Sequence, residues 1–136
     1  MQQIKRAPQW TNPINVIVPK FTYAGKHILA DFWHGKTIET EKELEELLRG
    51  AAKAANSKAL KVSLYKFEPQ GITGIILLAE SHIAVHTWPE IGYIAVDVFT
   101  CGKKSRPKEA MEFFRAYLQP KTYHIQEMKR GNMPRQ

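Results

Sequence analysis

The sequence predicts an α+β fold, a two-layer sandwich in which two helices pack on one face of a largely antiparallel sheet. Strand-like segments outnumber helical ones, and several follow one another through turns too short for a parallel crossover. Two further segments have helical periodicity with a single apolar stripe, so each buries one face. With 136 residues, of which 43% are hydrophobic and 24% charged, one domain is expected.

The first elements follow from local patterns. Residues 1–24 are expected to form an N-terminal arm or an extra strand around the apolar run at residues 16–18. Alternation predicts a strand over residues 27–33. Thr40, with Glu43 three residues later, predicts a capping box at the start of a helix. The expected buried stripe of this helix consists of Leu44, Leu47, Leu48, Ala51 and Ala55.

The second half continues with strands and one more helix, giving the order β-α-β-β-β-β-α-β. Ser105 is expected to cap the second helix, with Pro107 in its first turn. Its apolar stripe consists of Ala110, Phe113, Phe114, Tyr117 and Leu118. Strands are expected over residues 60–67, 75–78, 82–87, 93–99 and 123–128.

Composition narrows the function classes. The net charge of +7 raises the alternative of a basic, non-enzymatic nucleic-acid-binding domain, but the basic residues are spread along the chain, and no nucleic-acid partner is expected. No apolar run has the length of a membrane span, so no membrane partner is expected. Cys101 is the single cysteine, which excludes an internal disulfide and fits a reducing cytoplasm.

Polar residues gather in one apolar hairpin, residues 78–90, where burying them costs free energy unless each finds a partner. Considered one at a time, Ser81 could be an ordinary turn residue, and His86 could be a hydrogen-bonded histidine of the core. No GxSxG elbow surrounds Ser81, so a serine hydrolase has little support. A zinc site from His82, His86 and Cys101 is conceivable, but no metal-ligand spacing repeats elsewhere, and no metal is expected.

Three motifs carry a specific resemblance: Glu80-Ser81-His82, then His86-Thr87-Trp88-Pro89-Glu90, then Asp97-Val98-Phe99-Thr100-Cys101-Gly102. Together they resemble the signature of the prokaryotic, pyruvoyl-dependent S-adenosylmethionine decarboxylase proenzymes. The segments at residues 25–32 and 67–74 resemble the opening strand and the loop before the cleavage strand of that family. The resemblance covers roughly residues 25 to 130 and implies a single decarboxylase domain over residues 25–136.

The resemblance implies a zymogen that cuts itself without a protease. The Ser81 hydroxyl would attack the Glu80 carbonyl, leaving a β chain, residues 1–80, and an α chain, residues 81–136, that begins with a pyruvoyl group. His86 matches the family's processing histidine, and imidazole suits proton transfer near neutral pH. Thr73 stands where the family usually has a serine whose hydroxyl assists processing.

The resemblance also implies how the mature enzyme works. The pyruvoyl group derived from Ser81 would form a Schiff base with the substrate amine, and Cys101 matches the family's proton donor. Phe67 matches an aromatic residue that packs on adenine, Trp33 lies near a second such position, and Glu90 matches the carboxylate that binds the ribose hydroxyls. Phe67 and Trp33 could equally belong to the hydrophobic core.

The expected partner is S-adenosylmethionine, and its decarboxylated product would supply aminopropyl groups for polyamine (spermidine) synthesis. The resemblance further implies a homodimer of processed protomers with its active site near the interface. Some relatives of this fold decarboxylate arginine or ornithine with the same pyruvoyl group. That alternative substrate stays open, because the processing motif is common to both.

Overall fold

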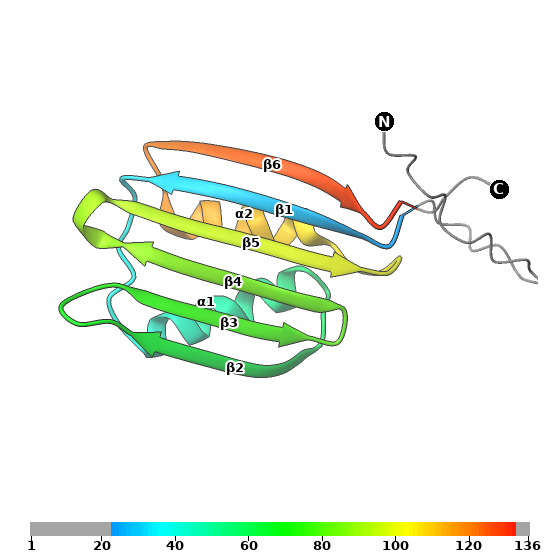
Figure 1. Ribbon diagram of the computed structural model, residues 1–136, viewed down its shortest axis with the longest axis horizontal. Helices are drawn as coiled ribbons and strands as arrows, with labels where there is room; N and C mark the ends of the chain where they lie inside the picture. The colour runs from blue at the N-terminus through cyan, green and yellow to red at the C-terminus, as the bar shows by residue number, and fades with distance from the viewer. Residues whose placement is uncertain (1–22, 133–136) are drawn as a thin grey trace, which may run out of the picture.

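A computed structural model of the protein describes residues 23–132. The apolar run at residues 16–18, predicted as an arm or extra strand, lies outside them. The described residues form six strands, two helices and one 3₁₀ turn, η1 (Figure 1). In chain order they are β1 (Gly25–Trp33), α1 (Glu41–Ala54), β2 (Ala59–Lys66), β3 (Ile72–Leu78), β4 (Ser81–Trp88), η1 (Pro89–Ile91), β5 (Tyr93–Cys101), α2 (Pro107–Leu118) and β6 (Thr122–Arg130).

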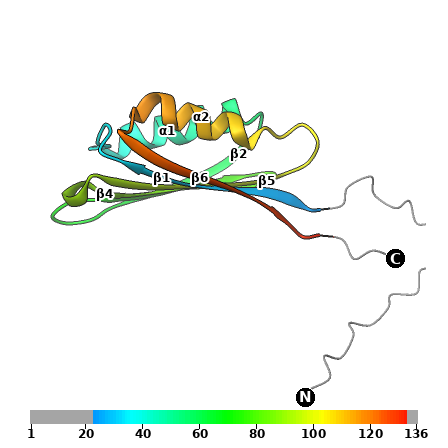
Figure 2. The same ribbon diagram turned by 90° about the horizontal axis from the view of Figure 1, so that it is seen from above.

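All six strands belong to one sheet, in the order β2-β3-β4-β5-β1-β6, and every neighbouring pair is antiparallel. The first strand in the chain therefore lies inside the sheet, between β5 and β6. Both helices cover the same face, and no element of residues 23–132 covers the opposite face of the sheet (Figure 2). The predicted α+β two-layer sandwich is confirmed.

The hydrophobic core lies between the helices and the sheet. The predicted stripe of α1 is fully buried, and Ala110, Phe114 and Leu118 of α2 are buried beside it. Alternate strand residues, such as Ile28, Phe32, Ile83 and Val98, complete this core. Because side chains alternate along a strand, the residues between them face away from the helices. These intervening positions include those of Trp33, Thr73 and His86.

Thr40 caps helix α1 as predicted, whereas the Glu43 carboxylate has another partner. The Thr40 side chain accepts a hydrogen bond from the Glu43 backbone N–H at 3.1 Å. The Glu43 carboxylate accepts a hydrogen bond from the Tyr117 hydroxyl, also at 3.1 Å, and so links the two helices.

The prediction that Ser105 caps α2 is wrong. The residue at the cap position is Arg106, whose backbone N–H donates to the Ala55 carbonyl at 2.8 Å. The start of α2 is therefore fixed by docking against the end of α1 rather than by a hydroxyl cap. Pro107 occupies the first turn, as predicted.

Strand β3 is longer than predicted. It starts at Ile72 rather than residue 75, because Thr73 and Gly74 pair with His86 and Val85 of β4. Gly74 leaves room for Leu44 and Leu64, because a Cβ at position 74 would lie only 2.7 Å from a side-chain carbon of each and these would have to shift. The extension brings Thr73 into direct register with His86.

Candidate active site

The turn between β3 and β4 contains the predicted cleavage bond. Leu78 pairs with Ser81, so only Ala79 and Glu80 form the turn. The turn is anchored to Lys58, which accepts a hydrogen bond from Ala79 N–H at 2.9 Å and donates its own N–H to the Glu80 carboxylate at 3.2 Å. The residues before the Glu80–Ser81 bond are thus held by the Lys58 backbone, and Ser81 after it is held by strand pairing with Leu78.

Ser81 has an unusual backbone conformation. Two-residue hairpin turns normally need positive φ within the turn, which glycine or asparagine supplies. Here the positive φ falls on Ser81, at 155°, in a region that favours glycine. Such a conformation costs about 1–3 kcal/mol and persists only where the surrounding structure enforces it. The strain lies at the residue whose amide bond is predicted to break.

Cys101 ends β5 next to this turn. Its Sγ atom donates a hydrogen bond to the Glu80 carbonyl oxygen at 3.1 Å, and its side chain is exposed. A cavity of about 340 Å³ opens beside it. Two hydroxyls at its wall, on Thr100 and Ser105, are buried without a hydrogen-bond partner among the described residues.

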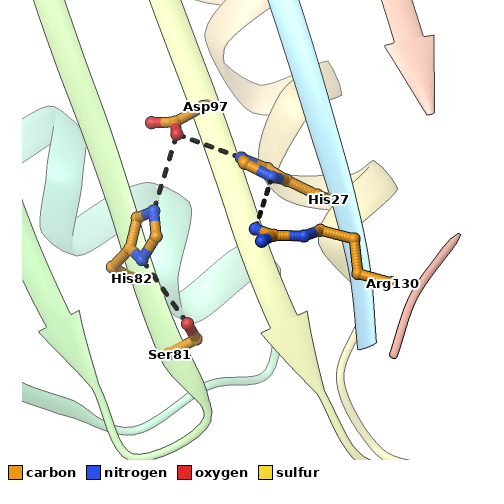
Figure 3. A network of polar contacts seen from close by, with 5 residues as sticks. All are labelled: His27, Ser81, His82, Asp97 and Arg130. Atoms are coloured by element: carbon orange, nitrogen blue, oxygen red, sulfur yellow. Dashed lines mark hydrogen bonds and ion pairs between the residues drawn. The ribbon is translucent and has the colours of Figure 1, made fainter. Parts of the chain in front are cut away.

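A chain of polar contacts runs from Ser81 across four strands (Figure 3). The Ser81 hydroxyl lies 3.4 Å from Nδ1 of His82, and Nε2 of His82 lies 3.5 Å from Oδ2 of Asp97. The same Asp97 oxygen lies 3.0 Å from Nε2 of His27, whose Nδ1 lies 3.3 Å from Arg130. The sequence suggested no Asp/His arrangement around Ser81, so these residues were missed as a group.

The ring of Phe99 holds this network in place. It lies between the two histidines, with centroid distances of 5.2 Å to His27 and 6.0 Å to His82, and the Arg130 guanidinium lies 4.8 Å above it. The signal that could have revealed the group is strand register, because Phe99 pairs with both histidines across β5. That register depends on β1 lying beside β5, which the sequence did not show.

The other predicted site residues lie at the opposite end of the sheet. Thr73 and His86 share a hydrogen bond between Oγ1 and Nδ1 at 3.0 Å. Glu90 lies in η1 and is exposed, and Phe67, just after β2, is 48% exposed. The alternative that Phe67 belongs to the hydrophobic core is therefore wrong.

Trp33 takes part in an aromatic stack at this end. It stacks on Tyr93 with a centroid distance of 4.4 Å, and Trp88 stacks on the other side of Tyr93 at 5.1 Å. Burial, together with the hydrogen bond and the charge of Asp31, raises the pKa of Tyr93 to about 12. The half-buried Trp33 lies on the open face of the sheet and not in the core between sheet and helices.

Within one chain, the two groups of site residues are far apart. His86 follows Ser81 by five residues on the same strand, which places it about 17 Å away at 3.4 Å per residue. The same spacing separates His82 from His86 by about 14 Å, so the zinc site considered from these two histidines and Cys101 is wrong. Ser81 and Cys101 form one half of the candidate site, and Thr73, His86, Glu90 and Phe67 form another.

Comparison with known proteins identifies the family. The family model for S-adenosylmethionine decarboxylase matches residues 26–131, nearly all of the described fold. The chain belongs to the S-adenosylmethionine decarboxylase family. An S-adenosylmethionine decarboxylase proenzyme from Persephonella marina is 45% identical over 112 residues, covering 81% of this chain and 84% of that one.

Other relatives of this decarboxylase family member agree. A proenzyme of the same name from Methanococcus aeolicus is 39% identical over 113 residues, covering 82% of this chain and 97% of its own. The crystal structure of the adenosylmethionine decarboxylase from Aquifex aeolicus matches with a TM-score of 0.78 and 41% identity, over 85% of this chain and 98% of that one. Neither helix in residues 23–132 is long and apolar enough to span a membrane.

Proposed function

We propose that this protein is a self-cleaving S-adenosylmethionine decarboxylase whose Glu80–Ser81 bond breaks to leave a pyruvoyl group on residue 81. The observation that carries the proposal is the strained turn at Ser81, with the Cys101 thiol in contact with the carbonyl of the bond to be cut. Conformational strain favours cleavage, because a cut chain no longer has to hold the unfavourable φ. The proenzyme names of the relatives are consistent with the same processing.

Cleavage would begin with attack of the Ser81 hydroxyl on the Glu80 carbonyl, which converts the amide into an ester. Removal of the α-proton of residue 81 then eliminates the Glu80 carboxylate, and hydrolysis with loss of ammonia follows. The imidazole of His86 is suited to the α-proton step, and the Thr73 hydroxyl, 3.0 Å from its Nδ1, fixes the ring orientation.

The residues around Ser81 fit a pyruvoyl group. When formed, the group would supply a carbonyl that condenses with the substrate amine and withdraws electrons while CO2 leaves. Cys101 contacts the Glu80 carbonyl and therefore stands beside residue 81, where a thiol can deliver a proton to the substrate carbon. The 340 Å³ cavity next to Cys101 gives the small end of the substrate room to approach.

We also propose that the active enzyme is a homodimer in which each site is shared. His86 cannot reach Ser81 of its own chain across about 17 Å. The open face of the sheet exposes large apolar side chains, which favours covering by another surface; they are Tyr65, Phe67, Ile75, Leu77 and Trp88. A two-fold axis over this face would bring His86 and Thr73 of the partner subunit to Ser81 and Cys101 of the first.

In such a dimer the partner's Phe67 and Glu90 would complete the substrate site. An exposed aromatic ring can stack on adenine and attract the sulfonium, and an exposed carboxylate can accept hydrogen bonds from ribose. Arginine and ornithine contain neither group, so these two residues favour S-adenosylmethionine. The product would serve polyamine synthesis in the cytoplasm.

The intact mass of the purified protein under denaturing conditions tests the self-cleavage. We expect two fragments, residues 1–80 with a normal carboxyl end and residues 81–136 lighter than their sequence mass by one ammonia. Ser81→Ala should give a single uncut mass and no CO2 release. An uncut wild-type chain that still decarboxylates S-adenosylmethionine would contradict the pyruvoyl mechanism.

A further inference from the structure

We propose that His82, backed by Asp97, is the base that takes the Ser81 hydroxyl proton in the first step of self-cleavage. This inference rests on the proposed cleavage at Glu80–Ser81 and assigns its first step to a histidine of the same chain, whereas His86 of the partner subunit serves the later α-proton step. The 3.4 Å between Ser81 Oγ and His82 Nδ1 is long for a hydrogen bond, which is common for reacting pairs before the reaction starts. Figure 3 shows both side chains at the start of β4.

The network determines which nitrogen of each histidine carries the proton. Arg130 can only donate, so Nδ1 of His27 accepts from it and Nε2 of His27 carries the proton. That N–H faces Oδ2 of Asp97 at 3.0 Å. The Asp97 carboxylate also attracts a proton to Nε2 of His82 at 3.5 Å, which leaves the lone pair on Nδ1, the nitrogen nearest Ser81.

His27 and Arg130 are therefore positioning residues. His27 contacts the same Asp97 oxygen as His82, Arg130 contacts His27 from behind, and the Phe99 ring packs against both imidazoles. The side chains of His27, His82 and Asp97 are 14%, 32% and 27% exposed. Water is thus partly excluded from the contacts, which strengthens the attraction between carboxylate and imidazole.

The same three residues also have the composition of a metal site, with ligand atoms within 4.8 Å of one another. The Arg130 contact disfavours that alternative. A metal ligand at His27 needs the Nε2 lone pair, which would move the proton to Nδ1 and set it against the guanidinium donor. A cation would also lie close to the positive charge of Arg130.

Conversion of the amide into the ester needs no group from outside the chain. The Ser81 hydroxyl proton moves to Nδ1 of His82 as the bond between Ser81 Oγ and the Glu80 carbonyl carbon forms. The Cys101 thiol donates to the carbonyl oxygen while that oxygen gains negative charge. The bond from the Glu80 carbon to the Ser81 nitrogen then breaks, and the proton held by His82 goes to that nitrogen. The products are an ester and a free amine.

His82 and His86 serve different steps: His82 serves formation of the ester, and His86 serves removal of the α-proton. Without His82 the chain should remain an amide, whereas without His86 it should pass to the ester and stop. The amide and ester forms are isomers with the same mass, so mass alone does not distinguish them. Neutral hydroxylamine cleaves esters and leaves peptide amides intact, and it therefore reports which step is blocked.

The experiment follows cleavage of His82→Gln, His86→Ala and wild type by intact mass, with and without hydroxylamine. We expect His82→Gln to slow cleavage by about 100-fold or more and to be insensitive to hydroxylamine. His86→Ala should accumulate a form that hydroxylamine cuts at residue 80. The double variant should be insensitive, because the first step precedes the second. His124→Gln, an exposed histidine on β6, is the matched control and should cut like wild type.

Asp97→Asn tests whether Asp97 positions His82. It also replaces His82→Gln as the test if that variant does not fold. It should slow cleavage by on the order of 100-fold, because an amide no longer fixes the proton of His82 on Nε2, again without an ester. A folded His82→Gln that cuts at the wild-type rate, or one that accumulates hydroxylamine-sensitive ester, would overturn the inference. So would cleavage that stops on chelation and resumes with Zn²⁺. A wild-type chain that never cuts would instead contradict the proposed function.

Discussion

The Cys101 thiol lies 3.1 Å from the Glu80 carbonyl oxygen, so one side chain touches the bond that is proposed to break and stands beside the residue that is proposed to become reactive. This contact predicts two unequal effects of Cys101→Ala. Turnover of the mature enzyme should fall by on the order of 100-fold, because the proton donor is lost. Cleavage should slow by at most about tenfold, because a thiol is only a weak hydrogen-bond donor to the carbonyl oxygen that gains charge. The rate of CO2 release measures turnover, and the rate of fragment formation measures cleavage. Wild-type turnover by Cys101→Ala would exclude the proton-donor role.

Thr73 offers a test of the processing hydroxyl. Thr73→Val keeps the β-branched shape but removes the hydrogen bond to His86, so cleavage should slow by about tenfold. Thr73→Ser keeps the hydroxyl and should cut at least as fast as wild type. The time course of fragment formation by intact mass compares the variants. Equal rates for Thr73→Val and Thr73→Ser would show that the hydroxyl is not used.

Mixed dimers test whether a site is shared between subunits. Neither Ser81→Ala nor His86→Ala should cut alone. When the two are co-expressed, one site of each mixed dimer has Ser81 from one chain and His86 of the partner subunit. The His86→Ala chain should then be cut and the Ser81→Ala chain should not, which differently tagged chains resolve by mass. An uncut mixture would contradict the shared site.

Glu90 and Phe67 are predicted to set substrate preference. The wild-type enzyme should release CO2 from S-adenosylmethionine much faster than from L-arginine. Glu90→Gln should raise KM by roughly tenfold or more, because hydrogen bonds to a charged acceptor are weakened. Phe67→Ala should raise KM by about tenfold through lost stacking. Both variants should still cut themselves; faster turnover of arginine would overturn the choice of substrate but not the mechanism.

The raised pKa of Tyr93 predicts that the folded protein loses stability at alkaline pH. Burial and Asp31 raise its pKa to about 12, against 10 in the unfolded chain, so the folded protein holds this proton more tightly. The resulting stabilisation is present below pH 10 and is lost as pH rises from about 10 to 12. Ultraviolet titration should show Tyr93 ionising later in wild type than in Asp31→Asn. Tyr93→Phe assigns the signal, and an unchanged late phase in that variant would contradict the assignment.

Most of the architecture was predictable because it depends on local patterns. The α1 stripe from Leu44 to Ala55 is buried as its spacing predicts, and the Thr40 cap forms. The prediction failed where contacts between distant segments decide the outcome. Arg106 replaces Ser105 at the cap because its N–H reaches Ala55, and β3 lengthens because residues 73 and 74 pair with β4.

The sequence by itself determined which reactive groups are present: a hydroxyl at Ser81, a thiol at Cys101, and imidazoles. It also contains motifs specific enough to indicate the family. The tertiary structure alone decided which of these groups meet. Antiparallel register and the insertion of β1 beside β5 bring His27, His82 and Asp97 together, and strand length carries His86 about 17 Å from Ser81. Register and strand order depend on pairing between distant segments, and residue spacing along the chain does not encode that pairing directly.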